Sequence, residues 1–111
     1  MEGHFKLAEA LKLLPTPEGA RDVELFHHGT LTIELYAPRS TDMQTPHSRD
    51  EIYVIASGTG TFRRGHDPDV KFGPGEVLFV PAGVDHRFKD FTDDLAAWVF
   101  FYGPKGGEKA R

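Results

Sequence analysis

The sequence predicts a small all-β domain, a sandwich or a barrel, preceded by one short helix. Three observations support this fold class. The chain has 111 residues, which suits a single domain with one core. After its first stretch, apolar residues alternate with polar ones or gather in short runs. Gly, Pro and Asp interrupt these runs at close intervals, as turns do between short strands.

The first predicted element is a short amphipathic helix. Leu7, Leu11 and Leu14 recur at the spacing of one helix face, and charged residues occupy the opposite face. The helix should end before Pro15, because proline disfavours helical geometry in the residue that precedes it. We therefore assign residues 1–17 to this helix and a linker.

Short strands make up the rest of the predicted domain, which spans residues 1–111 and has its barrel core at about 23–102. The Gly- and Lys-rich segment 103–111 is expected to be a flexible tail. The predicted strands are Val23–His28, Thr30–Ala37, Asp50–Ser57, Gly60–Arg64, Val70–Phe72, Glu76–Val80, His86–Lys89 and Ala96–Tyr102.

Composition argues against several classes of protein. Thirteen Lys and Arg against seventeen Asp and Glu give a net charge of −4, and the scattered basic residues argue against a nucleic-acid partner. The absence of Cys excludes disulfides and thiolate ligands, so that any metal must be held by His, carboxylate or other oxygen ligands. Charges interrupt the apolar N-terminal stretch, and no window is apolar enough to span a membrane. We expect a cytoplasmic protein without a membrane partner.

Two stretches carry residues suited to metal chemistry. His47 and Glu51 lie four residues apart at the start of a predicted strand and can share one face if that strand is regular. His86 follows another strand and a turn that contains Pro81 and Gly83. If the strands are neighbours, the three side chains converge.

These stretches resemble the two motifs of the cupin superfamily, whose members are small double-stranded β-helix (jelly-roll) barrels. The resemblance covers about Gly29 to Tyr102 and is fairly specific because both motifs occur in the correct order. The second motif is matched by Gly75, Pro81, Gly83 and His86, with Asp90 in place of the final Asn. The first motif is matched by His47, Glu51 and Gly58, with Arg39 in place of its first Gly and Thr45 in place of its first His.

The resemblance implies one divalent metal ion per chain, held by His47, Glu51 and His86. Fe, Mn, Ni, Co and Zn all suit these ligands. Thr45 stands where the family has a fourth ligand. Gln44 is a candidate replacement if the strand start is distorted, whereas strict alternation favours Thr45. A site with three ligands is the remaining alternative.

Two aromatic residues are candidates for the substrate pocket. Tyr53 lies two positions after Glu51, and Phe88 lies two positions after His86, so both should share the ligands' face. A buried phenol hydroxyl can orient a ligand, which makes Tyr53 the better candidate. A role in the barrel core is the alternative for both.

The function expected from the resemblance is that of a metal-dependent enzyme acting on a small organic molecule. Dioxygenase-type oxidation is the first expectation, and isomerase or lyase chemistry is the next. A non-catalytic cupin that binds a small molecule or a metal is the alternative. No Lys or second carboxylate can be placed as a general base, so the catalytic residues stay unassigned. Similarity to other small cupins also leads us to expect a homodimer.

Overall fold

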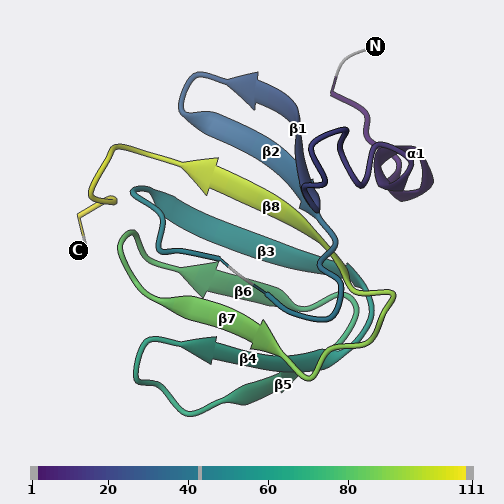
Figure 1. Ribbon diagram of the computed structural model, residues 1–111. Helices are drawn as coiled ribbons and strands as arrows, with labels where there is room; N and C mark the ends of the chain where they lie inside the picture. The colour runs from purple at the N-terminus through teal and green to yellow at the C-terminus, as the bar shows by residue number, and fades with distance from the viewer. Residues whose placement is uncertain (1–2, 43, 110–111) are drawn as a thin grey trace.

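The computed structural model describes residues 3–42 and 44–109 and confirms the predicted all-β barrel with a short N-terminal helix (Figure 1). In this part of the chain, antiparallel strands form a five-stranded sheet in the order β1-β2-β8-β3-β6 and a three-stranded sheet in the order β5-β4-β7. The elements are α1 (Leu7–Leu11), β1 (Asp22–His28), β2 (Leu31–Tyr36), β3 (Asp50–Ser57), β4 (Gly60–Arg64), β5 (Val70–Phe72), β6 (Val77–Val80), β7 (His86–Lys89) and β8 (Ala96–Tyr102).

The strand bounds agree closely with the prediction, and three strands differ by one residue at one or both ends. β1 begins at Asp22, β2 is confined to Leu31–Tyr36, and β6 begins at Val77. Helix α1 ends at Leu11, earlier than the leucine spacing suggests. The next residues form tighter turns, in which Leu14 N–H donates to the Leu11 carbonyl at 3.1 Å. The position before Pro15 cannot continue a regular helix, which explains the early end.

Strand β8 shows how the two faces of the larger sheet are used. Val99 points inward and belongs to the main hydrophobic core between the sheets. Ala96 is fully buried in a second cluster, which also contains Ala10 of α1 and Leu35 of β2. Partly buried Trp98 packs against that second cluster. Helix α1 therefore covers part of the outer face of the sheet, while the inner face closes the barrel.

The barrel interior is packed with aromatic rings. Phe88 of β7 lies 5.0 Å from the ring of Tyr53 and 5.0 Å from the ring of Phe62, measured between ring centroids. Phe72 lies 5.3 Å from the same Phe88 ring. This cluster joins the smaller sheet to β3 of the larger one and is close-packed. We call the rings of Tyr53, Phe62, Phe72 and Phe88 the aromatic floor of the barrel.

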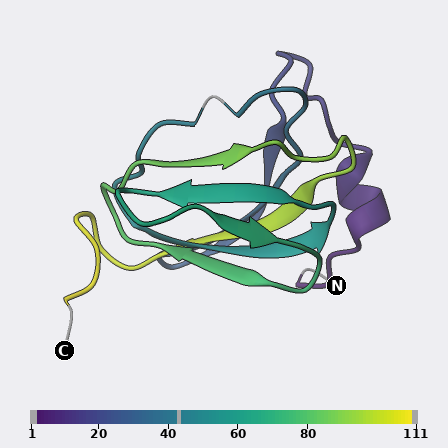
Figure 2. The same ribbon diagram turned by 90° about the horizontal axis from the view of Figure 1, so that it is seen from below.

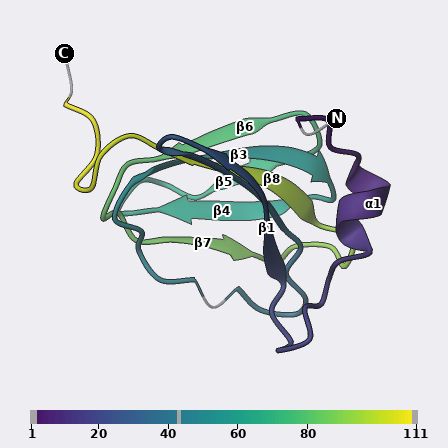
Figure 3. The same ribbon diagram turned by 90° about the horizontal axis from the view of Figure 1, so that it is seen from above.

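The segment after β8 is tied to the domain as far as Glu108. Gly106 N–H donates to the Ser48 carbonyl at 2.7 Å, and Glu108 N–H donates to Asp50 Oδ2 at 2.8 Å. These bonds constrain most of the segment that the sequence predicts to be a flexible tail. The segment and α1 lie at opposite ends of the molecule (Figures 2 and 3). None of the helices in residues 3–42 and 44–109 is long and apolar enough to cross a membrane.

Candidate metal centre

The two motif stretches meet where a turn packs against the start of β3. Gly83 N–H donates to the His47 carbonyl at 2.7 Å, and Ala82 N–H donates to Asp50 Oδ1 at 2.9 Å. Gly83 has a φ of 78°, a left-handed conformation that favours glycine. The turn before β7 is thereby fixed against the chain that carries His47, which brings His86 close to it.

His47 reaches the site from a loop rather than from the strand. β3 begins at Asp50, so strand alternation does not set the direction of the His47 side chain. Its ring instead packs edge-on against Phe101 of β8, with 4.8 Å between the ring centroids, and lies 5.4 Å from the ring of His86. Glu51, the second residue of β3, points inward as expected and is 1% exposed.

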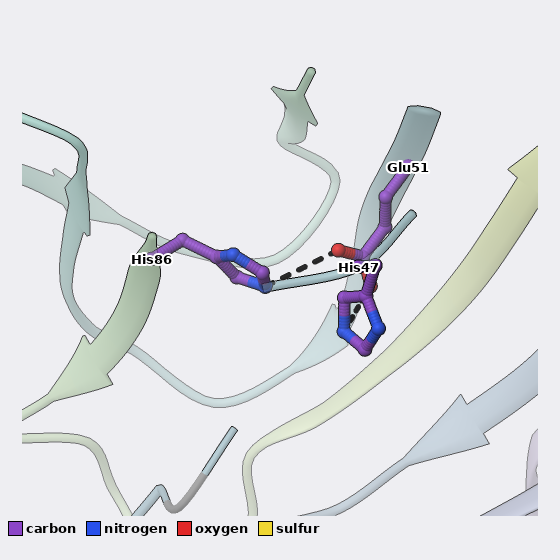
Figure 4. A group of neighbouring side chains, drawn as sticks. All are labelled: His47, Glu51 and His86. Carbon is purple, nitrogen blue, oxygen red and sulfur yellow. Dashed lines mark ion pairs between the residues drawn. The ribbon is translucent and has the colours of Figure 1, made fainter. Parts of the chain in front are cut away.

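The predicted triad converges at one point, as Figure 4 shows. His47, Glu51 and His86 each offer one ligand atom, and these atoms all lie within 4.8 Å of one another. His86 Nε2 is 3.2 Å from Glu51 Oε1, and His47 Nε2 is 3.8 Å from Glu51 Oε2. The other four histidines of the chain are exposed. The spacing of the three donors therefore suits a single metal ion.

The hydrogen bonds around the triad leave its donor atoms available. His86 Nδ1 donates to the Val84 carbonyl at 3.0 Å, which turns Nε2 toward Glu51. Both Glu51 oxygens and His47 Nε2 are buried and have no hydrogen-bond partner in the described part of the chain. Buried carboxylates without partners are costly unless a cation compensates them. The residues present thus fit a divalent metal.

The pKa of His86 reflects two opposing influences. Burial of the ring disfavours its charged form, but the Glu51 carboxylate and the Val84 carbonyl favour it, and the pKa is raised above its usual value. A proton on His86 and a metal on Nε2 compete for the same lone pair. Metal binding must therefore displace any proton held between His86 and Glu51.

Gln44 lies beside the triad but is engaged in hydrogen bonds. Its Oε1 accepts a bond from the Tyr53 hydroxyl at 2.6 Å, and its Nε2 donates to Asp42 Oδ2 at 2.9 Å. The same Tyr53 oxygen lies 3.1 Å from His86 Nε2. Gln44 and Thr45 both precede β3, so the alternation argument for Thr45 does not apply, and Thr45 is exposed. A Gln44–Tyr53 pair thus lies next to His86.

We predict that Gln44→Ala weakens metal affinity about 10- to 100-fold, as loss of a ligand or of its supporting hydrogen bonds typically does. Thr45→Ala should leave the affinity unchanged. Titration with Zn(II) against a chromogenic chelator measures both. Tyr53→Phe separates two roles for Gln44. If Gln44 acts through the Tyr53 phenol, Tyr53→Phe should weaken metal affinity as much as Gln44→Ala does. If Gln44 is itself a ligand, Tyr53→Phe should have little effect on metal affinity. A larger loss in Thr45→Ala than in Gln44→Ala would contradict the prediction.

A cavity of about 470 Å³ opens onto His47 and Glu51 of the triad. Its lining includes the residues Arg21, Glu34, Arg39, His47, Glu51 and Phe101. Tyr53 and Phe88, the predicted pocket residues, do not line it. They are 0% and 1% exposed and belong to the aromatic floor, because the sheets pack together below the ligands. Tyr53 and Phe88 do point into the barrel interior, as the ligands do. The cavity, however, lies nearer β2 and the loop after it.

Glu34 is a cavity carboxylate that the sequence analysis missed. It lies in the middle of β2 and is half-buried. Burial, together with the charges of Asp22, Glu24 and Glu51, raises its pKa to about 7. Glu34 can therefore hold or release a proton near neutral pH. The polar positions that alternate with Ile33 and Leu35 are the only signal in the sequence, and they do not reveal which face lies inside.

Comparison with known proteins identifies the family. The sequence model of the cupin domain family matches residues 32–102 of this chain. The chain belongs to the cupin family. Its three departures from the cupin motifs differ in kind. Asp90 has a φ of 49°, a left-handed conformation that Asp and Asn tolerate better than most residues. Arg39 and Thr45 line the cavity, so these two departures change what a ligand meets.

Several proteins are similar to this cupin. An uncharacterized protein of Streptomyces coelicolor is 33% identical over 103 residues, which cover 91% of this chain and 96% of that protein. An acireductone dioxygenase of Rhodopseudomonas palustris is 35% identical over 81 residues, which cover 69% of this chain. The match covers 48% of that enzyme, so this cupin corresponds to about half of its length.

Solved structures share the fold at low sequence identity. A protein of Thermus thermophilus has a TM-score of 0.71 and 23% identity, with 92% of this chain and 97% of that chain covered. The DMSP lyase DddQ of Ruegeria pomeroyi has a TM-score of 0.65 and 22% identity, with 74% of this chain and 46% of that chain covered. These likenesses support the fold alone.

Proposed function

We propose that this cupin binds one divalent metal ion through His47, Glu51 and His86 and catalyses a dioxygenase-type oxidation of a small organic molecule. The observation that carries the proposal is the buried Glu51 carboxylate, whose two oxygens lack hydrogen-bond partners in the described residues and face two imidazoles. The match to an acireductone dioxygenase supports oxidation over other cupin reactions. It covers about half of that enzyme, so substrate and reaction are part of the proposal.

The metal and the residues of the chain would have different roles in this reaction. A bound divalent metal would supply a Lewis acid for a substrate oxygen and open positions for O₂. His47 and Glu51 line the cavity, whereas His86 is buried behind them, so the substrate approaches from the cavity side. Glu34 lines the same cavity and can exchange a proton with the substrate near neutral pH.

The aromatic floor keeps water away from the inner side of the ligands. Tyr53, whose pKa is raised by burial and by the Glu51 charge, keeps its proton there. Its hydroxyl donates to Gln44 Oε1 and lies beside His86 Nε2, while His86 Nδ1 donates to the Val84 carbonyl and so orients the His86 ring. This arrangement holds the ligand ring rigid, as efficient metal chemistry requires.

We predict that the Fe(II)-loaded protein binds a bidentate oxygen ligand, such as a catechol or a 2-oxo acid, and develops a new visible absorption band. With a suitable compound the band should be accompanied by O₂ uptake. Absorption spectra and an oxygen electrode measure the two effects. Both should disappear in His86→Ala and persist in the control His66→Ala, which changes an exposed histidine.

The outcomes of this screen separate the candidate functions. A band with O₂ uptake supports a dioxygenase. A band without O₂ uptake from any compound contradicts oxidation and favours an isomerase, a lyase or a binding protein. The absence of any band contradicts an open metal position.

A further inference from the structure

Two arginines lie together at the cavity. Arg21 precedes β1 and Arg39 follows β2, and both line the space that opens onto His47 and Glu51. Arg21 Nε donates to the Ala37 carbonyl at 2.7 Å, and Arg39 Nη1 donates to the same oxygen at 3.4 Å. Two guanidinium groups thus converge on one backbone atom.

These two positive charges have no carboxylate partner in the described part of the chain. Among residues 3–42 and 44–109, no carboxylate oxygen lies within 4.0 Å of either guanidinium. Burial and the charge of Arg39 lower the pKa of Arg21, so the Arg39 charge disfavours the charged form of Arg21. On the smaller sheet, by contrast, Arg63 pairs with Asp85 at 3.0 Å and Lys89 with Asp69 at 2.7 Å.

The acidic residues of the cavity do not serve as partners. Asp22 and Glu34 line the same space but lie beyond ion-pair distance of both arginines. An anion placed between Arg21 and Arg39 would accept charge-assisted hydrogen bonds from two planar donors. Arg39 also stands where the cupin motif has Gly, so the pair is a feature of this chain rather than of the motif.

We propose that Arg21 and Arg39 form an anion-binding subsite for the carboxylate or phosphate group of the small organic molecule that occupies the cavity. The inference rests on the proposed function for calling that molecule the substrate, but the subsite itself does not require the metal. The cavity also has an apolar wall at Val99 and Phe101, which suits the carbon skeleton of such a molecule.

The subsite can be tested by ¹⁵N NMR of the arginine side chains in the full chain, with bound Zn(II) and after chelation. The probes are benzoate, phenyl phosphate and neutral benzyl alcohol. At least one of the two anions should shift the Nε–Hε signals of Arg21 and Arg39 with a common, saturable Kd, and benzyl alcohol should not. Arg21→Gln and Arg39→Gln should each weaken that Kd about tenfold or more, since a charge-assisted hydrogen bond contributes at least that factor.

Arg87→Gln is the matched control, because Arg87 is exposed on the smaller sheet and the substitution removes the same charge. It should leave the Kd unchanged. Saturable binding of benzoate alone assigns a carboxylate, and binding of phenyl phosphate alone assigns a phosphate. Absence of saturation with both anions, or equal weakening in Arg87→Gln, would overturn the subsite. Anion binding by a protein that takes up no metal would support the subsite and contradict the proposed enzyme.

Discussion

Glu51→Gln is expected to abolish metal binding while the barrel stays folded. The wild-type protein should carry about one divalent ion per chain after reloading, and the variant less than about a tenth of one. The amide would keep the shape of the side chain but would lose its charge and one of its two acceptor oxygens. Glu51 faces only the imidazoles of His47 and His86 and accepts no backbone hydrogen bond in the described residues, so we expect the substitution to leave the barrel folded.

Elemental analysis measures the metal content, and circular dichroism confirms that the variant is folded. Glu24→Gln is the matched control, since Glu24 also lies near a histidine, with its Oε2 3.2 Å from His27 Nδ1, but on the exposed surface. The control should retain the full metal content. A folded Glu51→Gln protein that still binds a full equivalent would exclude Glu51 as a ligand.

Asp42→Ala is expected to give the largest loss of stability among single substitutions near the site. Asp42 is 3% exposed and accepts four hydrogen bonds. Tyr36 O–H and Gln44 N–H donate to Oδ1, while Gln44 Nε2 and Phe88 N–H donate to Oδ2. Removal of the carboxylate leaves these donors unpaired in the interior. We expect the free energy of unfolding to fall by about 3 to 5 kcal/mol.

Urea denaturation, monitored by the fluorescence of Trp98, measures this loss. Asp42→Asn should be almost as damaging, because an amide can accept at one oxygen only and its NH₂ group would face two donors. Asp93→Ala provides the control, as Asp93 is exposed. It should change the free energy by no more than about 0.5 kcal/mol. A loss below about 1 kcal/mol in Asp42→Ala would show that the carboxylate does not hold the loop to β7.

The metal triad could be predicted from the sequence because the chain carries both cupin motifs in the correct order. His47 and Glu51 are close along the chain, and the Pro81–Gly83 turn places His86 at the start of β7 whatever the details of packing. The three side chains do converge, as predicted. The expected reason was wrong, because β3 and β7 are not neighbouring strands but belong to different sheets and meet across the barrel interior. The loop that carries His47 could not be foreseen, since its path depends on hydrogen bonds to a turn far away in the sequence.

The cavity was harder to predict because alternation along a strand does not show which face lies inside. In β2, apolar Leu35 packs on the outer face beneath α1, while Glu34 lines the cavity. Helix α1 covers part of the outer face of the sheet, so that face of β2 also carries a buried apolar residue. The usual alternation of a solvated polar face and a buried apolar face is therefore lost. Tyr53 and Phe88 do not line this cavity for a related reason, since the interior that they share with the ligands is filled by other rings.

The position of β8 restricts when the metal centre can form during protein synthesis. β8 is the last strand along the sequence, yet it pairs with both β2 and β3 in the middle of the larger sheet. A nascent chain without it would present two unpaired strand edges and would lack Phe101, which packs against His47. Translation must therefore pass beyond Tyr102 before His47 can take its place at the site, and we expect any metal to be bound by a finished barrel rather than by a growing chain.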